Sequence, residues 1–199
     1  MAKKGKFIVI EGPDGSGKSY QASLMVKYLE KQNIPVFLTE EPTSQMPIGK
    51  LIRRVLRKEL SVDPLTLQFL FIADRQEHVK KVILPAIESG IWVVSDRYFH
   101  STIAYGAMDI PFNWLMEISE IFLQPDVVFL LDASPEICLE RINEDKTRNG
   151  SAEFFERLDK LKKIRDNYLK INKLYPNTIL INCEKSFEEV SEEIKGYLI

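Results

Sequence analysis

FIVIEGPDGSGKSYQ, residues 7–21, is the stretch that decides the fold of this chain. Its first four residues form a continuous apolar run, which predicts a strand buried on both faces of a sheet. Residues 12–19 then satisfy the pattern G-x-x-x-x-G-K-[ST] at every required position. A helical pattern follows, with apolar residues at Leu24, Met25, Tyr28 and Leu29. Strand, glycine-rich loop and helix is the context in which this pattern indicates a phosphate-binding loop.

The residue types of the loop have a direct physical reason. Glycines let the backbone curl so that its N–H groups point inward, and the N-terminus of the following helix adds partial positive charge. Lys18 is expected to reach the terminal phosphates, and the Ser19 hydroxyl to bind Mg²⁺. A glycine-rich turn without a ligand is the alternative, which the complete pattern and its flanks disfavour. We therefore expect the chain to bind a nucleoside triphosphate.

Composition indicates the class of protein. A length of 199 residues suits one domain, and 45% hydrophobic with 28% charged residues is ordinary for a globular protein. The formal charge of −2 provides no basic field for nucleic acid or an anionic membrane. Cys138 and Cys183 fit neither a C-x-x-C nor a zinc spacing, so we expect reduced thiols in a cytoplasmic protein. The basic start and the short apolar run after it predict neither a signal peptide nor a membrane span.

Predicted strands and helices alternate along the rest of the chain. Apolar runs predict further strands at residues 36–39, 91–95, 127–131 and 178–181. Helical spacing of apolar residues predicts helices at residues 48–57, 64–89, 102–105, 114–122, 135–143, 152–174 and 187–198. Asp63 and Pro64 are typical of a helix start, and Pro85 predicts a kink near the end of that helix. Residues 144–151 have no apolar side chain and predict a solvated, mobile segment.

Five apolar strands that alternate with helices predict a parallel sheet with helices on both faces. In such a sheet the ligand lies at the carboxyl ends of the strands. Four segments should therefore share one rim: the loop from Gly12, Glu41-Pro42, Asp96-Arg97 and Asp132-Ala133.

Residues outside the loop must identify the reaction, because many proteins carry such a loop. Asp96 and Arg97 close an apolar strand and suit a metal shell and an anion, although a surface ion pair would also explain them. Phe71 and Arg75 lie at i and i+4 on one helix face and could clamp a base. By themselves, however, they are more simply interpreted as a core Phe and a surface Arg.

In combination, the motifs of this chain resemble those of the thymidylate kinases. In chain order they are EGxDGxGKSxQ at residues 11–21, EPT at 41–43, IGxxIR at 48–53, LFxAxR at 70–75, DRY at 96–98 and STxAY at 101–105. The resemblance implies a single P-loop domain over residues 1–199: a three-layer α/β/α sandwich with a five-stranded parallel sheet and a mobile lid at about 142–152. It also implies transfer of the γ-phosphoryl group of ATP to dTMP, giving dTDP and ADP in dTTP biosynthesis, with Mg²⁺ as cofactor.

The resemblance also implies which residues bind ATP. They are Gly12, Pro13, Asp14, Gly15, Ser16, Gly17, Lys18, Ser19, Arg141, Lys146 and Arg148. Some members carry a basic side chain where this chain has Gly15, and members without it place cations in the lid. Taken alone, the segment with Lys146 and Arg148 could equally be a solvated loop. Ser19 and Asp96 would hold the metal, and the catalytic residues would be Lys18, Arg97 and Asp14.

The residues implied to bind dTMP are Asp14, Glu41, Arg53, Phe71, Arg75, Arg97, Ser101, Thr102 and Tyr105. Phe71 would stack on thymine while Arg75 contacts its O4 edge. Arg53 would hold the acceptor phosphate, and Tyr105 would exclude a ribose 2′-hydroxyl. This chain departs from the family at Glu40, where many members carry an arginine, and at Gly106, where a polar residue often touches the base.

The reaction needs no general base, because a phosphate monoester is already an anionic nucleophile. His78 and His100 are therefore expected to have no catalytic role. A rival function is a kinase for a deoxynucleoside or another small acceptor, in which Glu40 or Glu41 could activate a neutral hydroxyl.

A nucleotide switch is a function of a different class. A guanine switch would need Asn-Lys-x-Asp after a strand, and the Asn-Lys pair at Asn172 lacks the Asp and lies in a predicted helix. We expect a homodimer that binds ATP and dTMP, with no nucleic acid or membrane partner. The family pairs through helices beside the sheet, and residues 65–71 are more apolar than one helix face of a monomer needs.

Overall fold

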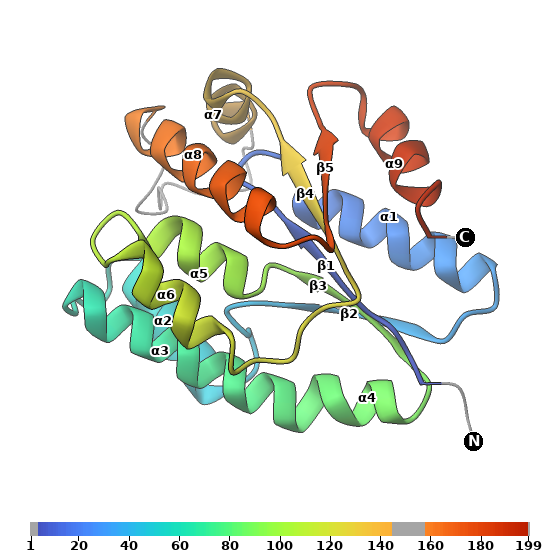
Figure 1. Cartoon of the computed structure of the whole chain (residues 1–199), viewed down its shortest axis with the longest axis horizontal. Helices are drawn as coiled ribbons and strands as arrows, with labels where there is room; N and C mark the ends of the chain where they lie inside the picture. Colours follow the sequence, from blue (N-terminus) through green and yellow to red (C-terminus); the bar gives the residue numbers. More distant parts are fainter. Residues whose placement is uncertain (1–3, 145–157, 199) are drawn as a thin grey trace.

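The computed structural model describes residues 4–144 and 158–198, and its centre is a five-stranded parallel sheet (Figure 1). The strands are β1 (Phe7–Glu11), β2 (Val36–Glu40), β3 (Trp92–Asp96), β4 (Val127–Asp132) and β5 (Thr178–Asn182). They lie in the order β2-β3-β1-β4-β5, and every neighbouring pair is parallel. The central strand is β1, so the loop that follows it emerges in the middle of the carboxyl edge of the sheet.

Alternating side chains along β1 build both halves of the core. All five residues of this strand are buried. Phe7 and Val9 point into one hydrophobic cluster, whereas Ile8 and Ile10 point into the other. A central parallel strand has no face toward solvent, which explains why its sequence is apolar without interruption.

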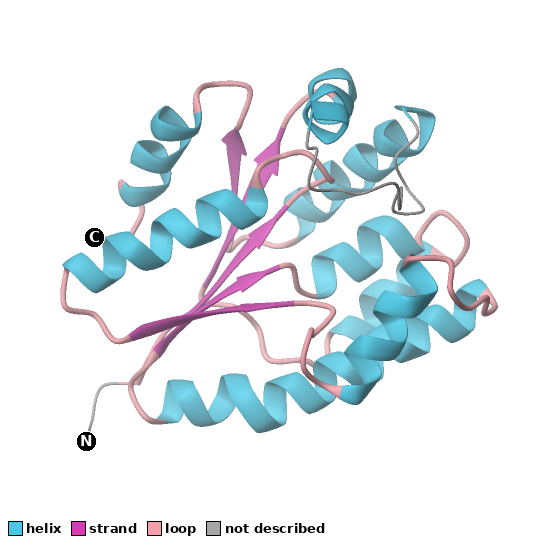
Figure 2. Ribbon diagram, turned by 180° about the vertical axis from the view of Figure 1, so that it is seen from behind, coloured by secondary structure: helices cyan, strands magenta, loops and turns pink. Residues whose placement is uncertain are grey.

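Helices cover both faces of the sheet, as Figures 1 and 2 show. The face of Phe7 is covered by α5 (Phe99–Gly106), α6 (Phe112–Ser119), α8 (Leu158–Leu174) and the π-helical turn η1 (Val79–Ile83). The face of Ile8 is covered by α1 (Lys18–Lys31), α7 (Pro135–Glu144) and α9 (Phe187–Lys195). The fold is therefore the three-layer α/β/α sandwich that the sequence predicted.

Helices α2 (Pro47–Leu56) and α3 (Pro64–His78) follow β2 and pack against each other. The predicted start of α3 is confirmed, because the Asp63 carboxylate accepts hydrogen bonds from the backbone N–H groups of Leu65 and Thr66. Through η1, α3 continues into α4 (Leu84–Glu88). Helix α3 also packs against α5, and these two helices lie beside the functional site.

Most predicted elements are confirmed within one or two residues, and the differences have local causes. The helix predicted at residues 64–89 is helical almost throughout, and the expected irregularity takes the form of the π-helical turn η1. Pro85 follows that turn; because a proline ring would clash with the carbonyl four residues earlier, a widened turn ahead of it relieves the conflict. The short helix predicted at 102–105 already begins at Phe99, and the one predicted at 114–122 occupies Phe112–Ser119.

Part of the predicted lid and of the helix at 152–174 cannot be compared. Lys146, Arg148 and residues 152–157 lie outside the described residues, whereas residues 142–144 belong to α7.

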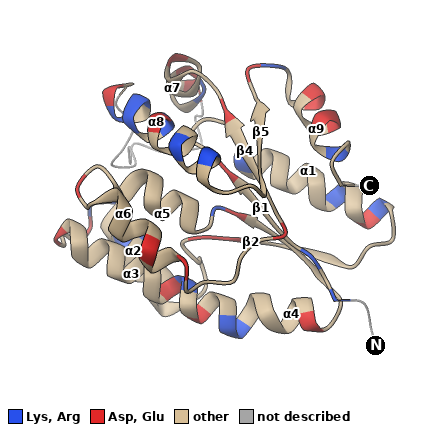
Figure 3. Cartoon of the chain, viewed as in Figure 1, with Lys and Arg blue, Asp and Glu red and all other residues tan. Residues whose placement is uncertain are grey.

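Cys138 and Cys183 are buried free thiols. Acidic and basic residues are interspersed over the helices (Figure 3). Within residues 4–144 and 158–198, every helix is too short or too polar to cross a membrane.

Candidate active site

A pocket of about 340 Å³ opens at the carboxyl edge of the sheet, beside the ends of β2 and β3. Its lining comes from the loop after β1, the turns after β2 and β3, and helices α2, α3 and α5. The residues predicted to bind dTMP all line it: Asp14, Glu41, Arg53, Phe71, Arg75, Arg97, Ser101, Thr102 and Tyr105. The predicted rim is thus confirmed for the loop, Glu41-Pro42 and Asp96-Arg97. Asp132 ends β4 at the same edge of the sheet but does not line this pocket, and it accepts two hydrogen bonds from Arg165, at 2.7 and 2.9 Å.

The loop between β1 and α1 has a backbone suited to an anion. Gly12, Gly15 and Gly17 have φ angles of 144°, 82° and 93°, which residues with side chains rarely adopt. At Gly15 there is also no space, because an added Cβ would lie 2.2 Å from the carbonyl oxygen of Cys138. A backbone of this shape can direct successive N–H groups toward a phosphate at the start of α1.

Lys18 is a buried cation beneath this loop. Its Nζ donates to the carbonyl oxygen of Pro13 at 2.7 Å and lies 3.8 Å from Oδ1 of Asp14. Burial, and then the positive charge of Arg97, lower the pKa of the ammonium, while Asp14 opposes the shift. A phosphate would be a stronger partner for this ammonium than a neutral carbonyl. The side chain is therefore close to where the terminal phosphates of a nucleotide would lie.

Ser19 and Asp96 carry side-chain oxygen atoms that could bind a cation. The Ser19 hydroxyl donates a short hydrogen bond to one carboxylate oxygen of Asp96. The other carboxylate oxygen, Oδ1, is buried and has no hydrogen-bond partner among the described residues. A hydroxyl and a carboxylate are the hard donors that Mg²⁺ prefers, and a Mg²⁺ bound with nucleotide phosphates needs few protein ligands. In the described part of the chain no group of three His, Cys, Asp or Glu side chains forms another candidate metal site.

Arg97 connects the loop to α5. Its backbone has a φ of 72°, an uncommon value for a residue with a side chain, and the Ser95 hydroxyl donates to its carbonyl at 2.7 Å. The guanidinium makes a short ion pair with Asp14 and donates to Ser101 Oγ at 2.8 Å. It also donates to the Tyr105 hydroxyl at 3.3 Å. An Asp96–Arg97 surface pair is therefore the wrong interpretation, because Arg97 faces the pocket and pairs with the loop.

Glu11 holds the turn after β3, a role that the sequence did not reveal. Its carboxylate is fully buried and accepts hydrogen bonds from the backbone N–H groups of Tyr98 and Ser101. The hydroxyls of Ser101 and Tyr168 donate to its other oxygen at 2.6 and 2.9 Å. Burial raises the pKa of Glu11, while the charge of Arg97 and these hydrogen bonds oppose the rise. The sequence feature that could have indicated this role is the position of Glu11, a charged residue directly after the apolar run of β1.

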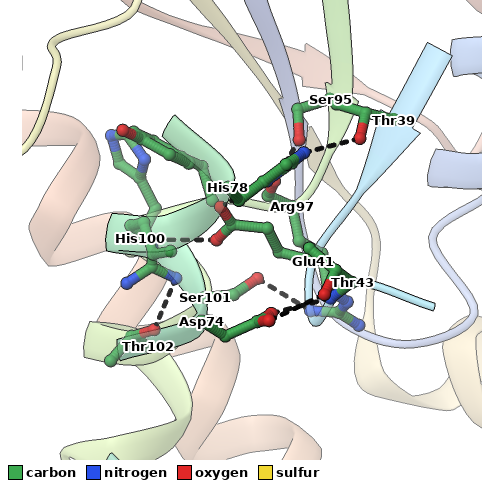
Figure 4. A network of polar contacts seen from close by, with 12 residues as sticks. Thr39, Glu41, Thr43, Asp74, His78, Ser95, Arg97, His100, Ser101 and Thr102 are labelled. Atoms are coloured by element: carbon green, nitrogen blue, oxygen red, sulfur yellow. Dashed lines mark hydrogen bonds and ion pairs between the residues drawn. The ribbon is translucent and has the colours of Figure 1, made fainter. Parts of the chain in front are cut away.

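Arg75 is the most unexpected residue of the pocket, because only 1% of it is exposed. Its Nε donates to Glu41 at 2.8 Å, and one Nη donates to the Thr102 hydroxyl at 2.8 Å. Behind it, Nδ1 of His78 lies 3.1 Å from Glu41, and Nε2 lies 2.7 Å from the Thr39 hydroxyl (Figure 4). The remaining nitrogen, Nη1, is buried without a hydrogen-bond partner among the described residues. Surface Arg was thus the wrong interpretation of this side chain.

Phe71 and Arg53 lie on other sides of the same pocket. Phe71 is half-buried and lines the pocket one helical turn before Arg75. Arg53 donates to the carbonyl of Pro42 at 2.5 Å, and its guanidinium lies 2.9 Å from a carboxylate oxygen of Glu40. Glu40 therefore neutralises part of the charge that Arg53 could offer to an anion.

The pocket includes Gln68, which was not predicted, and lacks Arg141, which was predicted to bind ATP. Arg141 does not line this pocket; it donates to the carbonyl of Cys183 at 3.0 Å and lies over the ring of Phe187. Neither His78 nor His100 lines the pocket. Gln68 does line it and was not predicted. Its place on the pocket side of α3, one turn before Phe71, was the signal that could have found it.

Comparison with known proteins agrees with this geometry. The family model for thymidylate kinase matches residues 10–194. A probable thymidylate kinase of Pyrococcus horikoshii is 40% identical over 197 residues, covering 96% of this chain and 94% of that protein. A thymidylate kinase of Clostridium novyi is 36% identical over 203 residues and covers 98% of both chains. A probable thymidylate kinase of Methanocaldococcus jannaschii is 40% identical over 193 residues, covering 96% of this chain and 95% of that protein.

Proposed function

The chain belongs to the thymidylate kinase family and is an ATP-dependent nucleoside monophosphate kinase, and we propose that its pocket performs the reaction as follows. The reaction is transfer of the γ-phosphoryl group of ATP to dTMP, giving dTDP and ADP for dTTP biosynthesis. The observation that best supports this use of the pocket is that one cavity contains the cations Lys18 and Arg97 at the loop and the buried Arg75 beside Phe71. A nucleoside monophosphate needs both kinds of group, one for its phosphate and one for its base.

The donor nucleotide binds at the loop. Residues 12–19 hold the phosphates of ATP through backbone N–H groups and the start of α1. Lys18 moves from the Pro13 carbonyl to the transferring group, where it stabilises the charge that develops. Arg141, Lys146 and Arg148 are proposed to contribute further cations for ATP.

Mg²⁺ is the proposed cofactor, and Ser19 with Asp96 would hold it. Asp96 Oδ1 supports this assignment, because it is an oxygen that lacks a partner among the described residues. When bound, Mg²⁺ would neutralise phosphate oxygens and help to align the two substrates.

The acceptor binds between α3 and α5. Phe71 stacks on the thymine, while Nη1 of Arg75 donates to the base; its other nitrogens are held by Glu41 and Thr102. Tyr105 lies against the guanidinium of Arg97 and limits space for a ribose 2′-hydroxyl.

The two phosphates meet beside Arg97. This guanidinium is proposed to bridge the acceptor and donor phosphates, and Ser101 supports it through a hydrogen bond. Arg53 binds the acceptor phosphate from α2. Asp14 orients Arg97 and is close enough to the pocket to meet the deoxyribose 3′-hydroxyl or a metal-bound water.

The rival reaction, phosphorylation of a nucleoside hydroxyl, needs a free carboxylate as base. Both oxygens of Glu41 are occupied, one by Arg75 and one by His78. Glu40 pairs with Arg53. A monophosphate acceptor needs no such base, so the arrangement favours dTMP over thymidine.

We also propose that the enzyme is a cytoplasmic homodimer. Leu65 and Phe69, one turn apart on α3, are exposed by 39 and 51%, and the ring of Phe69 packs on Trp114 of α6. Such exposed apolar side chains near one another on a helix are typical of a surface that another subunit covers. Sedimentation at micromolar concentration should give the mass of two chains; a monomer mass would reject the dimer.

The proposed cytoplasmic location is supported by Cys138 and Cys183, because buried free thiols suit a reducing compartment.

An acceptor panel tests the proposed function. ADP release from Mg²⁺-ATP would be measured with dTMP, dUMP, ribo-TMP, dCMP and thymidine, with Lys18→Ala as the control for contaminating kinases. We expect dTMP to be the best acceptor and thymidine to be inert. ADP release that dTMP does not stimulate, or that only thymidine stimulates, would reject the proposal.

A further inference from the structure

We propose that Gln68 recognises the base of the acceptor by pairing its side-chain amide with the N3–H and an adjacent carbonyl of a thymine or uracil ring. The inference rests on the proposed function and adds a specificity-determining residue to it. Gln68 is 7% exposed and lines the pocket from α3. Its Oε1 is buried and has no hydrogen-bond partner among the described residues. Because an unpaired amide oxygen is unfavourable inside a protein, a ligand that brings a donor to it gains affinity.

The position of Gln68 on α3 matches the chemistry of such a base. Gln68, Phe71 and Arg75 are separated by three and four residues, so they lie on one face of the helix. Arg75 Nη1 is also buried without a partner among the described residues. An unpaired acceptor and an unpaired donor thus stand on either side of an aromatic ring. Thymine and uracil complement this set with an N–H, a carbonyl oxygen and a flat ring face.

The neighbouring helix leaves room for the amide. A Cβ added to Gly106 on α5 would lie 2.8 Å from Oε1 and 2.9 Å from Cδ of Gln68. Any residue with a side chain at this position would therefore displace the amide. Thr102, one turn earlier on α5, already accepts a hydrogen bond from Arg75, so part of its acceptor capacity is used. Gln68 Oε1, in contrast, is still available to accept a hydrogen bond from the base N–H.

The test is base discrimination by Gln68→Met, which has a similar size but no amide. We expect kcat/KM for dTMP to fall about 10- to 100-fold, while the KM for ATP is unchanged. Wild type should prefer dTMP over N3-methyl-dTMP, which lacks the N–H, and Gln68→Met should bring this ratio close to one. The Tm of the unliganded protein should not fall, because the variant removes a buried polar group without a partner.

A second variant tests the same contact from α5. With Gln68 present, Gly106→Ala should reduce the ratio of kcat/KM for dTMP to kcat/KM for N3-methyl-dTMP, because the added methyl group displaces the Gln68 amide. In a Gln68→Ala background the same change should have no further effect on that ratio.

The outcomes separate this inference from the function on which it rests. If wild type does not phosphorylate dTMP, the proposed function fails and the role of Gln68 fails with it. If wild type phosphorylates dTMP but Gln68→Met retains the full preference over N3-methyl-dTMP, only the role of Gln68 is overturned. A lower Tm with unchanged base discrimination would likewise overturn it, since Gln68 would then only support the fold.

Discussion

Arg75 and Glu41 form an ion pair in which Nε and Oε2 lie 2.8 Å apart, with side-chain exposures of 2 and 4%. Glu41 is itself contacted by Nδ1 of His78, and Arg75 is held on its other side by Thr102. The pair therefore fixes a guanidinium inside the pocket. Because Glu41 and Thr102, from two different segments, both hold this guanidinium, Nη1 is left in a fixed position, where we propose that it contacts the acceptor base.

Glu41→Ala should destabilise the protein, because it leaves the buried guanidinium without its counter-charge. We expect the free energy of unfolding to fall by about 3–5 kcal/mol and the KM for dTMP to rise far more than that for ATP. Urea unfolding and steady-state kinetics measure both effects. Glu59→Ala, which removes an exposed partner of Arg54 and Arg57, is the control and should leave the free energy of unfolding almost unchanged. Similar costs for the two variants would contradict the role of the buried pair.

Glu40→Gln should improve binding of dTMP. The Glu40 carboxylate lies 2.9 Å from Arg53 and, if Arg53 binds the acceptor phosphate as proposed, competes with it for that cation. Because the pair is partly exposed, we expect the KM for dTMP to fall only about two- to five-fold, and less at high salt. Glu30→Gln, an exposed residue of α1, removes the same charge away from the pocket and should change nothing. An increased KM in Glu40→Gln would mean that Glu40 positions Arg53 for the phosphate.

His100 should make stability depend on pH. Its ring stacks on Phe99 at 4.1 Å, and burial, then the charge of Arg75, lower its pKa to about 3. In the unfolded chain the imidazole is protonated below about pH 6.5, whereas in the folded chain it stays neutral until the pH approaches 3. The free energy of unfolding is therefore highest above about pH 6.5 and falls as the pH falls toward 3. The carboxylate of Glu11 lies 3.9 Å from the ring, and Glu11 is unchanged in the His100→Phe variant that is compared with wild type below.

The measurement for His100 is the free energy of unfolding of wild type and His100→Phe at pH 7 and pH 4. Wild type should lose on the order of 3 kcal/mol more than the variant over this interval. Equal losses in the two proteins would show that the buried imidazole does not carry the effect.

Lys18→Ala should abolish turnover without unfolding the protein. Its ammonium is proposed to stabilise charge that develops during transfer, so kcat should fall by at least about 10²–10³-fold. Arg97→Ala should have nearly the same effect, because Arg97 is proposed to bind both phosphates. Circular dichroism and Tm check that the fold persists. Near wild-type turnover in Arg97→Ala would reject its proposed position between the phosphates.

Local patterns in the sequence were enough to predict the fold. The apolar run of β1, the loop glycines and the cap at Asp63 depend on neighbours only a few residues away. Such signals survive without knowledge of the tertiary structure, and the parallel order of the strands follows from their alternation with helices.

The buried polar contacts could not be predicted in this way. Arg75 finds Glu41 34 residues earlier and Thr102 27 residues later, and Tyr168 meets Glu11 across 157 residues. A helical pattern alone assigns an arginine to the surface, because burying its charge is costly unless a partner compensates it. The partner becomes visible only in the folded chain. Gln68 could not be predicted for the same reason: its amide lies against Gly106 of α5, a neighbour that only the folded chain shows.

The most direct test of the account is kcat/KM for dTMP in Phe71→Ala, since the central claim is that the pocket between α3 and α5 binds the acceptor base. The expected loss is about 5- to 150-fold, corresponding to about 1–3 kcal/mol for stacking of a base on an aromatic ring, with the KM for ATP unchanged. Phe112→Ala is the control, because Phe112 is half-buried in the core but does not line the pocket. A selective loss for dTMP in Phe71→Ala alone is the predicted result. Equal losses for ATP and dTMP, or none, would contradict the account.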